Sequence, residues 1–117
     1  MRDRTDALRT LGIGDIFHGE GSNGASLLCL VTGVTETTIE ARTMTSQYAL
    51  EFDRRTGTCV WGKGAGTIDS IALLPDEIRD ALLGLDRRYR VGDDATLSDR
   101  EKRALIYVAS FYPANPV

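Results

Sequence analysis

The sequence predicts an α+β protein in which a small, strongly bent antiparallel β-sheet, or barrel, spans residues 14–73 and two helices follow. The sheet is indicated by residues 39–43 and 48–53, where apolar and polar side chains alternate. A period of two places successive side chains on opposite faces of a half-buried strand. The helices are indicated by residues 78–89, where apolar side chains recur at the spacing of an amphipathic helix.

The pattern places a short helix at residues 3–11, ahead of the sheet. Six strands are predicted, at residues 15–18, 25–34, 39–44, 48–53, 58–61 and 68–73. Residues 53–57 should form a hairpin turn, with Gly57 in its left-handed position. Segment 25–34 is apolar on both faces, so we expect a second layer to cover its outer face.

Two helices should follow the sheet. Pro75 suits the first position of a helix, and Asp76 and Glu77 favour its positively charged end. Ser98 and Glu101 form a capping box that opens the last helix, which Pro113 should end. The buried face of this last helix is predicted to include Leu105, Val108, Ala109 and Tyr112.

This order of elements resembles an SH3-like small barrel with a helical appendage. The resemblance covers residues 14–73, concerns the fold alone and carries no functional residues with it. We expect residues 1–117 to form a single domain, with the barrel-like sheet at 14–73 and the helices at 75–112.

Composition excludes several classes of function. The chain has 117 residues and a net charge of −3, and neither half is basic enough for tight nonspecific nucleic-acid binding. The N-terminus carries acidic residues, and no apolar run is long enough for a membrane span, so a cytoplasmic location is expected. Cys29 and Cys59 are expected to be reduced and buried, with a disulfide as the alternative.

Two segments match phosphate-binding motifs by letter only. Residues 19–24 read G-x-G-x-x-G, but no buried parallel strand precedes them and no helix follows. Residues 57–63 read G-x-x-x-x-G-K, but Gly64 stands where a magnesium-binding Ser or Thr is needed. We therefore predict no nucleotide cofactor, and leave open whether the loops 19–24 and 62–66 bind another ligand.

His18 is the only histidine, and a base needs a positioned partner. Asp15 or Glu20 would offer only a weak dyad. The histidine and the two cysteines share no spacing typical of a metal site. The sequence therefore predicts no metal, no cofactor and no enzyme, and a small enzyme or ligand-binding barrel that uses His18 would require a pocket beside that residue.

Several residues are candidates for contact with a partner. Arg54 and Arg55 are predicted at a hairpin tip, and Lys63, in the loop 62–66, could also contact an anionic partner. Trp61 is expected to pack in the core or at its rim, or else to line a groove with Tyr48 or Phe17. On the last helix, the apolar residues that lie off the main stripe would, if exposed, favour dimerisation or docking; they are Ile106, Tyr107 and Phe111.

These observations favour a small, non-enzymatic, cytoplasmic protein-interaction module. Its partner would be another protein or a second copy in a homodimer, acting as adaptor or inhibitor, and no membrane is involved. The alternative is a weak nucleic-acid-binding barrel that uses the basic hairpin tip. The residues predicted to contact a partner are Arg54, Arg55, Trp61, Lys63, Ile106, Tyr107 and Phe111.

Overall fold

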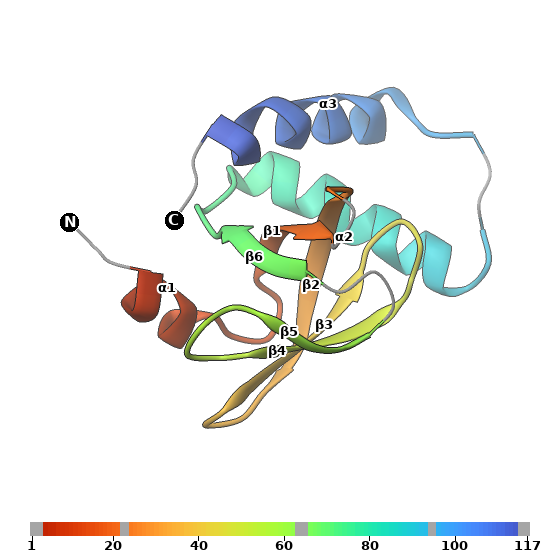
Figure 1. The fold of residues 1–117 in the computed structure, drawn as a ribbon. Helices are drawn as coiled ribbons and strands as arrows, with labels where there is room; N and C mark the ends of the chain where they lie inside the picture. The colour runs from red at the N-terminus through yellow and green to blue at the C-terminus, as the bar shows by residue number, and fades with distance from the viewer. Residues whose placement is uncertain (1–3, 22–23, 63–65, 94–95, 115–117) are drawn as a thin grey trace.

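The structure, a computed structural model, describes residues 4–21, 24–62, 66–93 and 96–114, with side chains for 6–21, 24–61, 66–93 and 96–112. Helix α1 precedes six strands, and two helices follow them (Figure 1). The elements are α1 (Arg4–Thr10), β1 (Ile16–Gly21), β2 (Ser26–Val34), β3 (Thr38–Thr43), β4 (Ala49–Asp53), β5 (Cys59–Gly62), β6 (Gly66–Ser70), α2 (Asp76–Arg90) and α3 (Asp99–Ala114).

The six strands form one antiparallel sheet in the order β5-β4-β3-β2-β1-β6. The sheet curls so strongly that its two edge strands approach each other. Thr58 and Thr67 form an isolated bridge there, and the Ile68 N–H donates to the Gly57 carbonyl at 2.8 Å. The predicted α+β class, with a strongly bent sheet, is confirmed as a half-barrel.

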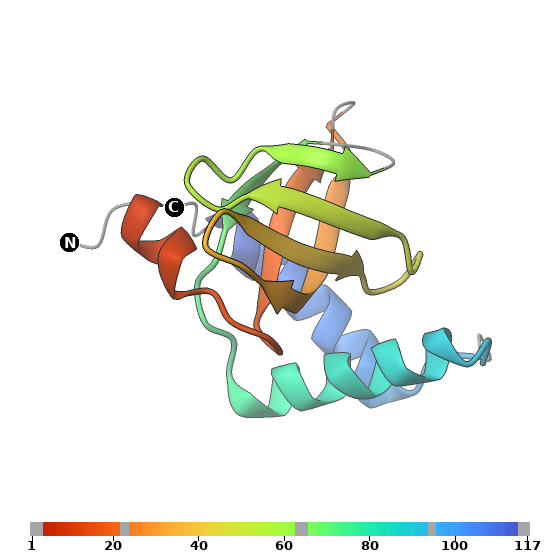
Figure 2. The same ribbon diagram turned by 90° about the horizontal axis from the view of Figure 1, so that it is seen from below.

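The concave side of the sheet holds one hydrophobic core, the inner core. Cys29 and Val31 of β2 point inward, and Phe17 meets Phe52 edge-on with ring centroids 5.4 Å apart. Leu8 and Leu11, in and just after α1, join this cluster, so the short helix covers one end of the half-barrel (Figure 2). Burial of these apolar side chains explains why the strands, in which apolar and polar residues alternate, curl around the inner core.

The convex side of the sheet holds a second hydrophobic core, the outer core. Ile16 and Leu30 point outward there, and α2 and α3 supply Leu82, Val108 and Tyr112. Strand β2 is therefore covered on both faces, as its apolar composition predicted. Tyr112 is fully buried and its hydroxyl donates to the Ile16 carbonyl at 2.8 Å, which fixes the end of α3 against β1.

Glycines bring β6 close to β1 and extend the first strand beyond its expected end. Gly19 and Gly21 belong to β1 rather than to a loop. A Cβ on Gly19 would lie 3.1 Å from the Thr67 carbonyl oxygen, and one on Gly66 would lie 1.6 Å from that of Glu20. Small residues thus permit strand pairing where their composition suggested a loop.

The last strand and the two helices differ in detail from the sequence prediction. Strand β6 ends at Ser70, not Leu73, and Pro75 is the N-cap of α2 rather than its first residue. The capping box is confirmed, since Ser98 and Glu101 each accept the other's backbone N–H. Helix α3 continues through Pro113 to Ala114, and Ala109 is exposed because the buried stripe runs through Ala104, Val108 and Tyr112.

Two ion pairs hold the helices in place. Arg42 of β3 donates to both carboxylate oxygens of Asp86, at 3.2 and 2.7 Å, and Gln47 adds a third hydrogen bond at 2.9 Å. Arg88 of α2 pairs with Glu101 of α3. The first pair joins α2 to the sheet, and the second joins the two helices to each other.

The Asp86 carboxyl is a buried charge with good partners. Burial alone would raise its pKa, but the hydrogen bonds from Arg42 and Gln47 outweigh that effect and hold the pKa below its ordinary value. Arg88 and the Ser98 N–H similarly lower the pKa of Glu101. Both carboxylates therefore stabilise the folded chain in their charged form.

Both cysteines are free thiols, as expected, but only Cys29 is buried, and Cys59 is half-buried rather than buried as predicted. Cys29 lies in the inner core, where burial raises the pKa of its thiol, and Cys59 packs against the same cluster. Among the described residues, no helix combines the length and the apolar character that a bilayer crossing requires.

We predict that Asp86→Ala lowers the free energy of unfolding by about 3 kcal/mol at neutral pH, because Arg42 would lose its carboxylate partner. The loss of unfolding free energy relative to the parent should reach its full value above the pKa of an aspartate in the unfolded chain, about 3.9. It should shrink as the pH falls through the lower, folded-state value, because the parent loses the same interaction.

Urea unfolding at a series of pH values measures this difference. The matched control is Asp80→Ala, since Asp80 is an exposed carboxylate on the same helix. Equal losses in the two variants would contradict the assignment of Asp86 as the link between α2 and the sheet.

Candidate functional site

A β-bulge turns the single tryptophan outward. Cys59 of β5 pairs with Phe52, but Trp61 pairs with Glu51, so Val60 is an extra residue in the ladder. Without the bulge, Trp61 would share the inward face of Cys59, two residues earlier. The extra residue places Trp61 on the face of Glu51 instead, and its side chain is 63% exposed.

Trp61 stands beside two facing glutamates. Glu40 of β3 is directly opposite Glu51 of β4, and Glu51 is directly opposite Trp61 of β5. The three side chains and Thr32 line a shallow hollow of about 220 Å³ on the convex face of the sheet. A Cβ on Gly33 would lie 2.5 Å from Glu40 Oε2, so the glycine leaves room for this carboxylate. The hollow therefore combines an aromatic side chain with two acids.

The charge of the two glutamates is not neutralised within the described part of the chain. Neither forms an ion pair there. Arg42 is two residues from Glu40, but its guanidinium is committed to Asp86. Like charges directly opposite each other on a sheet repel, so this hollow presents negative charge that an incoming cation would relieve.

The other two aromatic residues predicted for this groove lie elsewhere. Phe17 is fully buried in the inner core, so it cannot line a surface groove. Tyr48 is exposed, immediately before β4, but it does not line the Trp61 hollow. Of the three aromatics, only Trp61 contributes to it.

Arg54 acts as a clamp between chain segments. Its guanidinium donates to the carbonyls of Thr35, Arg9 and Leu11, at 2.5, 2.6 and 3.3 Å. Two of these carbonyls lie at or just beyond the C-terminal end of α1, where a cation is favourable. The clamp joins α1 to the β2–β3 turn, so Arg54 is directed into the protein.

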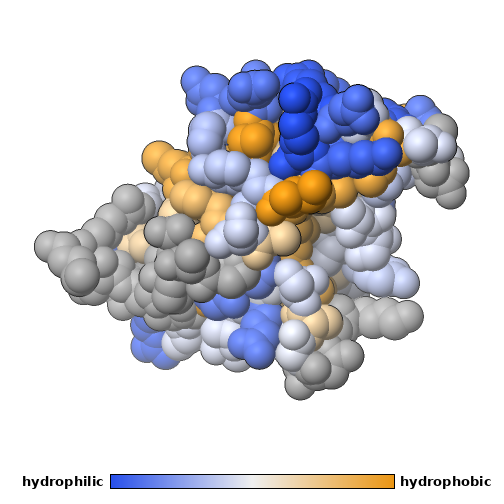
Figure 3. Space-filling view, turned by 90° about the horizontal axis from the view of Figure 1, so that it is seen from above, coloured by the Kyte–Doolittle hydropathy of each residue, from blue (hydrophilic) through white to orange (hydrophobic). Residues whose placement is uncertain are grey.

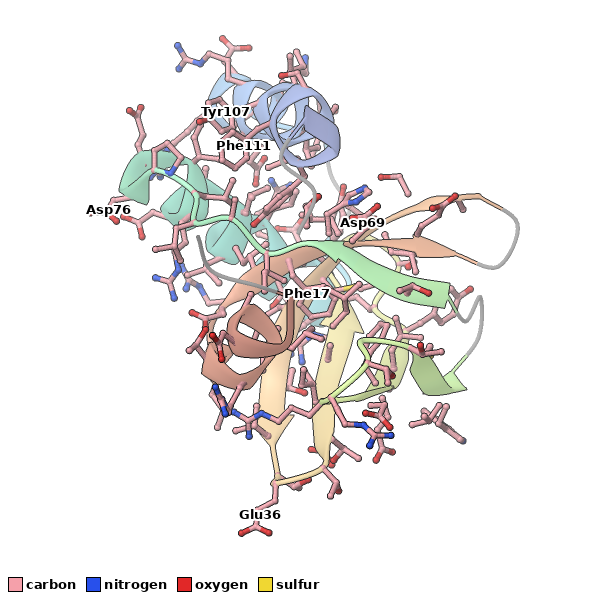
Figure 4. All side chains as sticks on the ribbon, turned by 60° about the vertical axis from the view of Figure 1, so that its left-hand side comes forward. Phe17, Glu36, Asp69, Asp76, Tyr107 and Phe111 are labelled. Atoms are coloured by element: carbon pink, nitrogen blue, oxygen red, sulfur yellow. The ribbon has the colours of Figure 1, made fainter. Side chains whose placement is uncertain are left out.

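The exposed arginine of the predicted hairpin tip is Arg55. The turn itself is confirmed: Gly57 has a φ of 75°, and the Asp53 carboxylate accepts the N–H groups of Arg55 and Thr56 at 2.8 and 3.1 Å. A hollow beside it is lined by Arg9, Glu36, Arg54 and Arg55, and Figure 4 shows Glu36 at the tip of the β2–β3 hairpin. Lys63 lies outside the described residues.

The candidate patch on α3 is smaller than its composition suggested. Ile106 is 70% exposed. Tyr107 and Phe111 are half-buried and stack on each other with centroids 5.2 Å apart, against the outer core (Figure 4). Figure 3 shows that hydrophilic side chains separate the apolar areas on this face.

The two glycine-rich motifs occur in β-structure. Residues 19–21 belong to β1, which is antiparallel to β2, and no helix begins between them. Residues 59–62 form β5. Neither segment has the strand-to-helix geometry that a phosphate cradle needs, although residues 22–23 and 63–65 are outside the described chain.

A second polar cluster forms around His18, with partners that the sequence did not reveal. His18 Nδ1 lies 2.6 Å from Asp69 Oδ1, and Nε2 lies 2.5 Å from the hydroxyl of Ser26. The neighbouring Asp15 and Glu20, which the sequence offered only as weak partners, do not take this role. Asp69 comes from β6, 51 positions away, and only the pairing of β1 with both β2 and β6 unites the three residues.

The part of the chain that the structure describes holds no group of three His, Cys, Asp or Glu side chains suited to a metal ion. The two candidate sites among the described residues are the Trp61 hollow and the Ser26–His18–Asp69 cluster. Comparison of the chain with models of known protein families, with curated proteins and with solved structures gave no match.

Proposed function

We propose that this protein is a small protein-interaction module that binds a basic side chain of a partner protein in the Trp61 hollow. The observation that carries the proposal is the exposed Trp61, which a bulge directs to the face of Glu40 and Glu51. An aromatic ring beside two carboxylates suits a lysine or arginine side chain, which gains a cation–π contact and an ion pair in one place.

The magnitudes fit a modest, specific contact. A cation over an exposed tryptophan gains about 0.5–1 kcal/mol, and about 2 kcal/mol once water is displaced. The hollow is shallow and accommodates one side chain rather than a whole small-molecule ligand. Neighbouring contacts with the partner would supply the remaining affinity.

The facing glutamates support a binding role independently of the tryptophan. Like charges directly opposite each other on a sheet lower the stability of the fold. No hydrogen bond or ion pair among the described residues offsets that cost for Glu40 and Glu51. Such a pair is explained if a cation from outside completes it.

We also propose that the protein is cytoplasmic and that its sheet is an SH3-like barrel. Two free thiols in and against one core suit a reducing compartment such as the cytoplasm. The curled sheet with nearly meeting edges is consistent with an SH3-like barrel, and a second copy of the chain remains one candidate partner through Ile106.

Weak nucleic-acid binding is the alternative, and the structure offers it less support. The guanidinium of Arg54 is engaged by three backbone carbonyls, so Arg55 is the one of the two hairpin-tip arginines that is exposed to a phosphate. The two hypotheses require opposite ligand charges, so one pair of probes separates them.

We predict that a lysine-rich peptide binds the full chain and that Trp61→Ala weakens binding about fivefold to thirtyfold, as expected for a cation–π contact of 1–2 kcal/mol. Fluorescence anisotropy of the labelled peptide measures the affinity. Leu73→Ala is the matched control, because Leu73 is an exposed apolar residue away from the hollow.

Unchanged peptide affinity in Trp61→Ala would show that the Trp61 hollow is not the binding site. If the chain instead bound a single-stranded oligonucleotide, with an affinity that falls steeply with salt and depends on Arg55, the nucleic-acid alternative would replace the proposed function.

We further predict that Glu51→Gln raises the free energy of unfolding by about 0.2–1 kcal/mol, because it removes the repulsion from Glu40. The same change should weaken the binding of the lysine-rich peptide to the protein. The control is Glu36→Gln, which makes the same charge change at the hairpin tip and should leave peptide affinity unaltered. A loss of stability together with unchanged binding would contradict this role of the glutamate pair.

A further inference from the structure

The Ser26–His18–Asp69 cluster has the connectivity of an activated serine. The Ser26 hydroxyl lies 2.5 Å from one ring nitrogen of His18, and the Asp69 carboxylate lies 2.6 Å from the other. We propose that Ser26 is a nucleophile that accepts an acyl group from an ester, with His18 as its general base and Asp69 as the positioning residue. This role is independent of the Trp61 hollow and differs from the sequence prediction that the chain is not an enzyme. It also differs from the expectation that such a role would require a pocket beside His18, because the hollows described above do not adjoin His18 and the substrate would instead meet the exposed Ser26.

The hydrogen bonds determine which nitrogen carries the proton. A carboxylate only accepts, so His18 Nδ1 must be the donor to Asp69. In the neutral ring, Nε2 is then the acceptor, and the Ser26 O–H donates to it. This is the tautomer that a general base needs in order to take the proton from the serine hydroxyl.

The base is held rigidly while the nucleophile is accessible. His18 is only 8% exposed, and its ring stacks on Tyr112 with centroids 6.1 Å apart. Tyr112 is itself anchored, since its carbonyl accepts the Ser70 hydroxyl at 2.6 Å. Ser26, the first residue of β2, is exposed to solvent, so a substrate can reach it without opening the core.

A second bulge places the positioning residue. His18 pairs with Ser70 and Gly19 pairs with Ile68, so Asp69 is an extra residue in β6. Figure 4 shows Asp69 beside the β1–β2 hairpin. The extra residue brings the carboxylate into reach of the ring on the strand next to it.

The surrounding charges define the class of substrate. Glu20 is directly opposite Ser26 in the β1–β2 ladder, and Asp69 lies on the other side of His18. Two carboxylates near the nucleophile disfavour anionic substrates such as phosphate esters. The cluster therefore suits a neutral or cationic carboxylic ester.

The Ser26 oxygen forms a bond to the carbonyl carbon of the ester, and the serine proton passes to His18 Nε2. The bond from that carbon to the leaving alkoxide breaks, and His18 returns the proton to the alkoxide. The products are an acyl-serine and an alcohol, and water then releases the carboxylic acid by the same route.

The test uses the full chain and p-nitrophenyl acetate. We expect peptide mass spectrometry to locate an acetyl group on Ser26, and nitrophenolate release to exceed that of Ser26→Ala about 100-fold, the contribution typical of a general base. Ser110→Ala is the matched control, because Ser110 is an exposed serine whose hydroxyl meets only backbone carbonyls. It should react at the parent rate.

Asp69 is tested by rescue. Asp69→Asn should slow acetylation of Ser26 without changing the site of the adduct, and Asp69→Glu should restore part of the rate. Acetyl groups found only at other residues, such as Cys59 or Lys102, would overturn the proposal. So would equal rates for the parent and Ser26→Ala. The position of the acetyl group is determined on the parent protein, which requires no variant. The proposal can therefore be refuted even if a variant does not fold.

Discussion

The burial of β2 on both faces determines how the other elements are arranged. Cys29 and Val31 face the inner core, while Leu30 faces the helices. The inner face forces the sheet to curl around its own side chains, and the outer face requires a second layer, which α2 and α3 supply. The helices pack mainly against β1 and β2 and reach β3 through the Arg42–Asp86 pair, and they leave the Trp61 side chain exposed to a partner.

Both chemical features of the molecule depend on interruptions in the sheet. The extra residue Val60 moves Trp61 from the inner face to the outer face, and the extra residue Asp69 meets the ring of His18. Bulges commonly redirect side chains next to functional sites. Here one bulge places an aromatic side chain beside two acids that form no ion pair among the described residues, and the other brings the Asp69 carboxylate to the ring of His18. The regular strands supply the rigid support for both.

The sequence was sufficient to predict the class of fold, because that class depends on local periodicity. The alternation in β3 and β4, the capping box at Ser98 and the turn at Gly57 all have short-range causes, and each is confirmed. The site was not predictable in the same way. Asp69 and His18 meet only through strand pairing, and a one-residue bulge reverses the direction of Trp61. Arg54 looked like a surface residue because nothing local indicates that it clamps three distant carbonyls.

Trp61 faces outward, and we propose that a cationic partner covers it. The chain has one tryptophan, so quenching of its fluorescence by acrylamide reports on this side chain alone. We expect efficient quenching in the free protein and clear protection when a lysine-rich peptide is added. Protection should be absent with a glutamate-rich peptide of equal length. A tryptophan already shielded in the free protein, or one whose quenching the lysine-rich peptide does not change, would contradict this proposal.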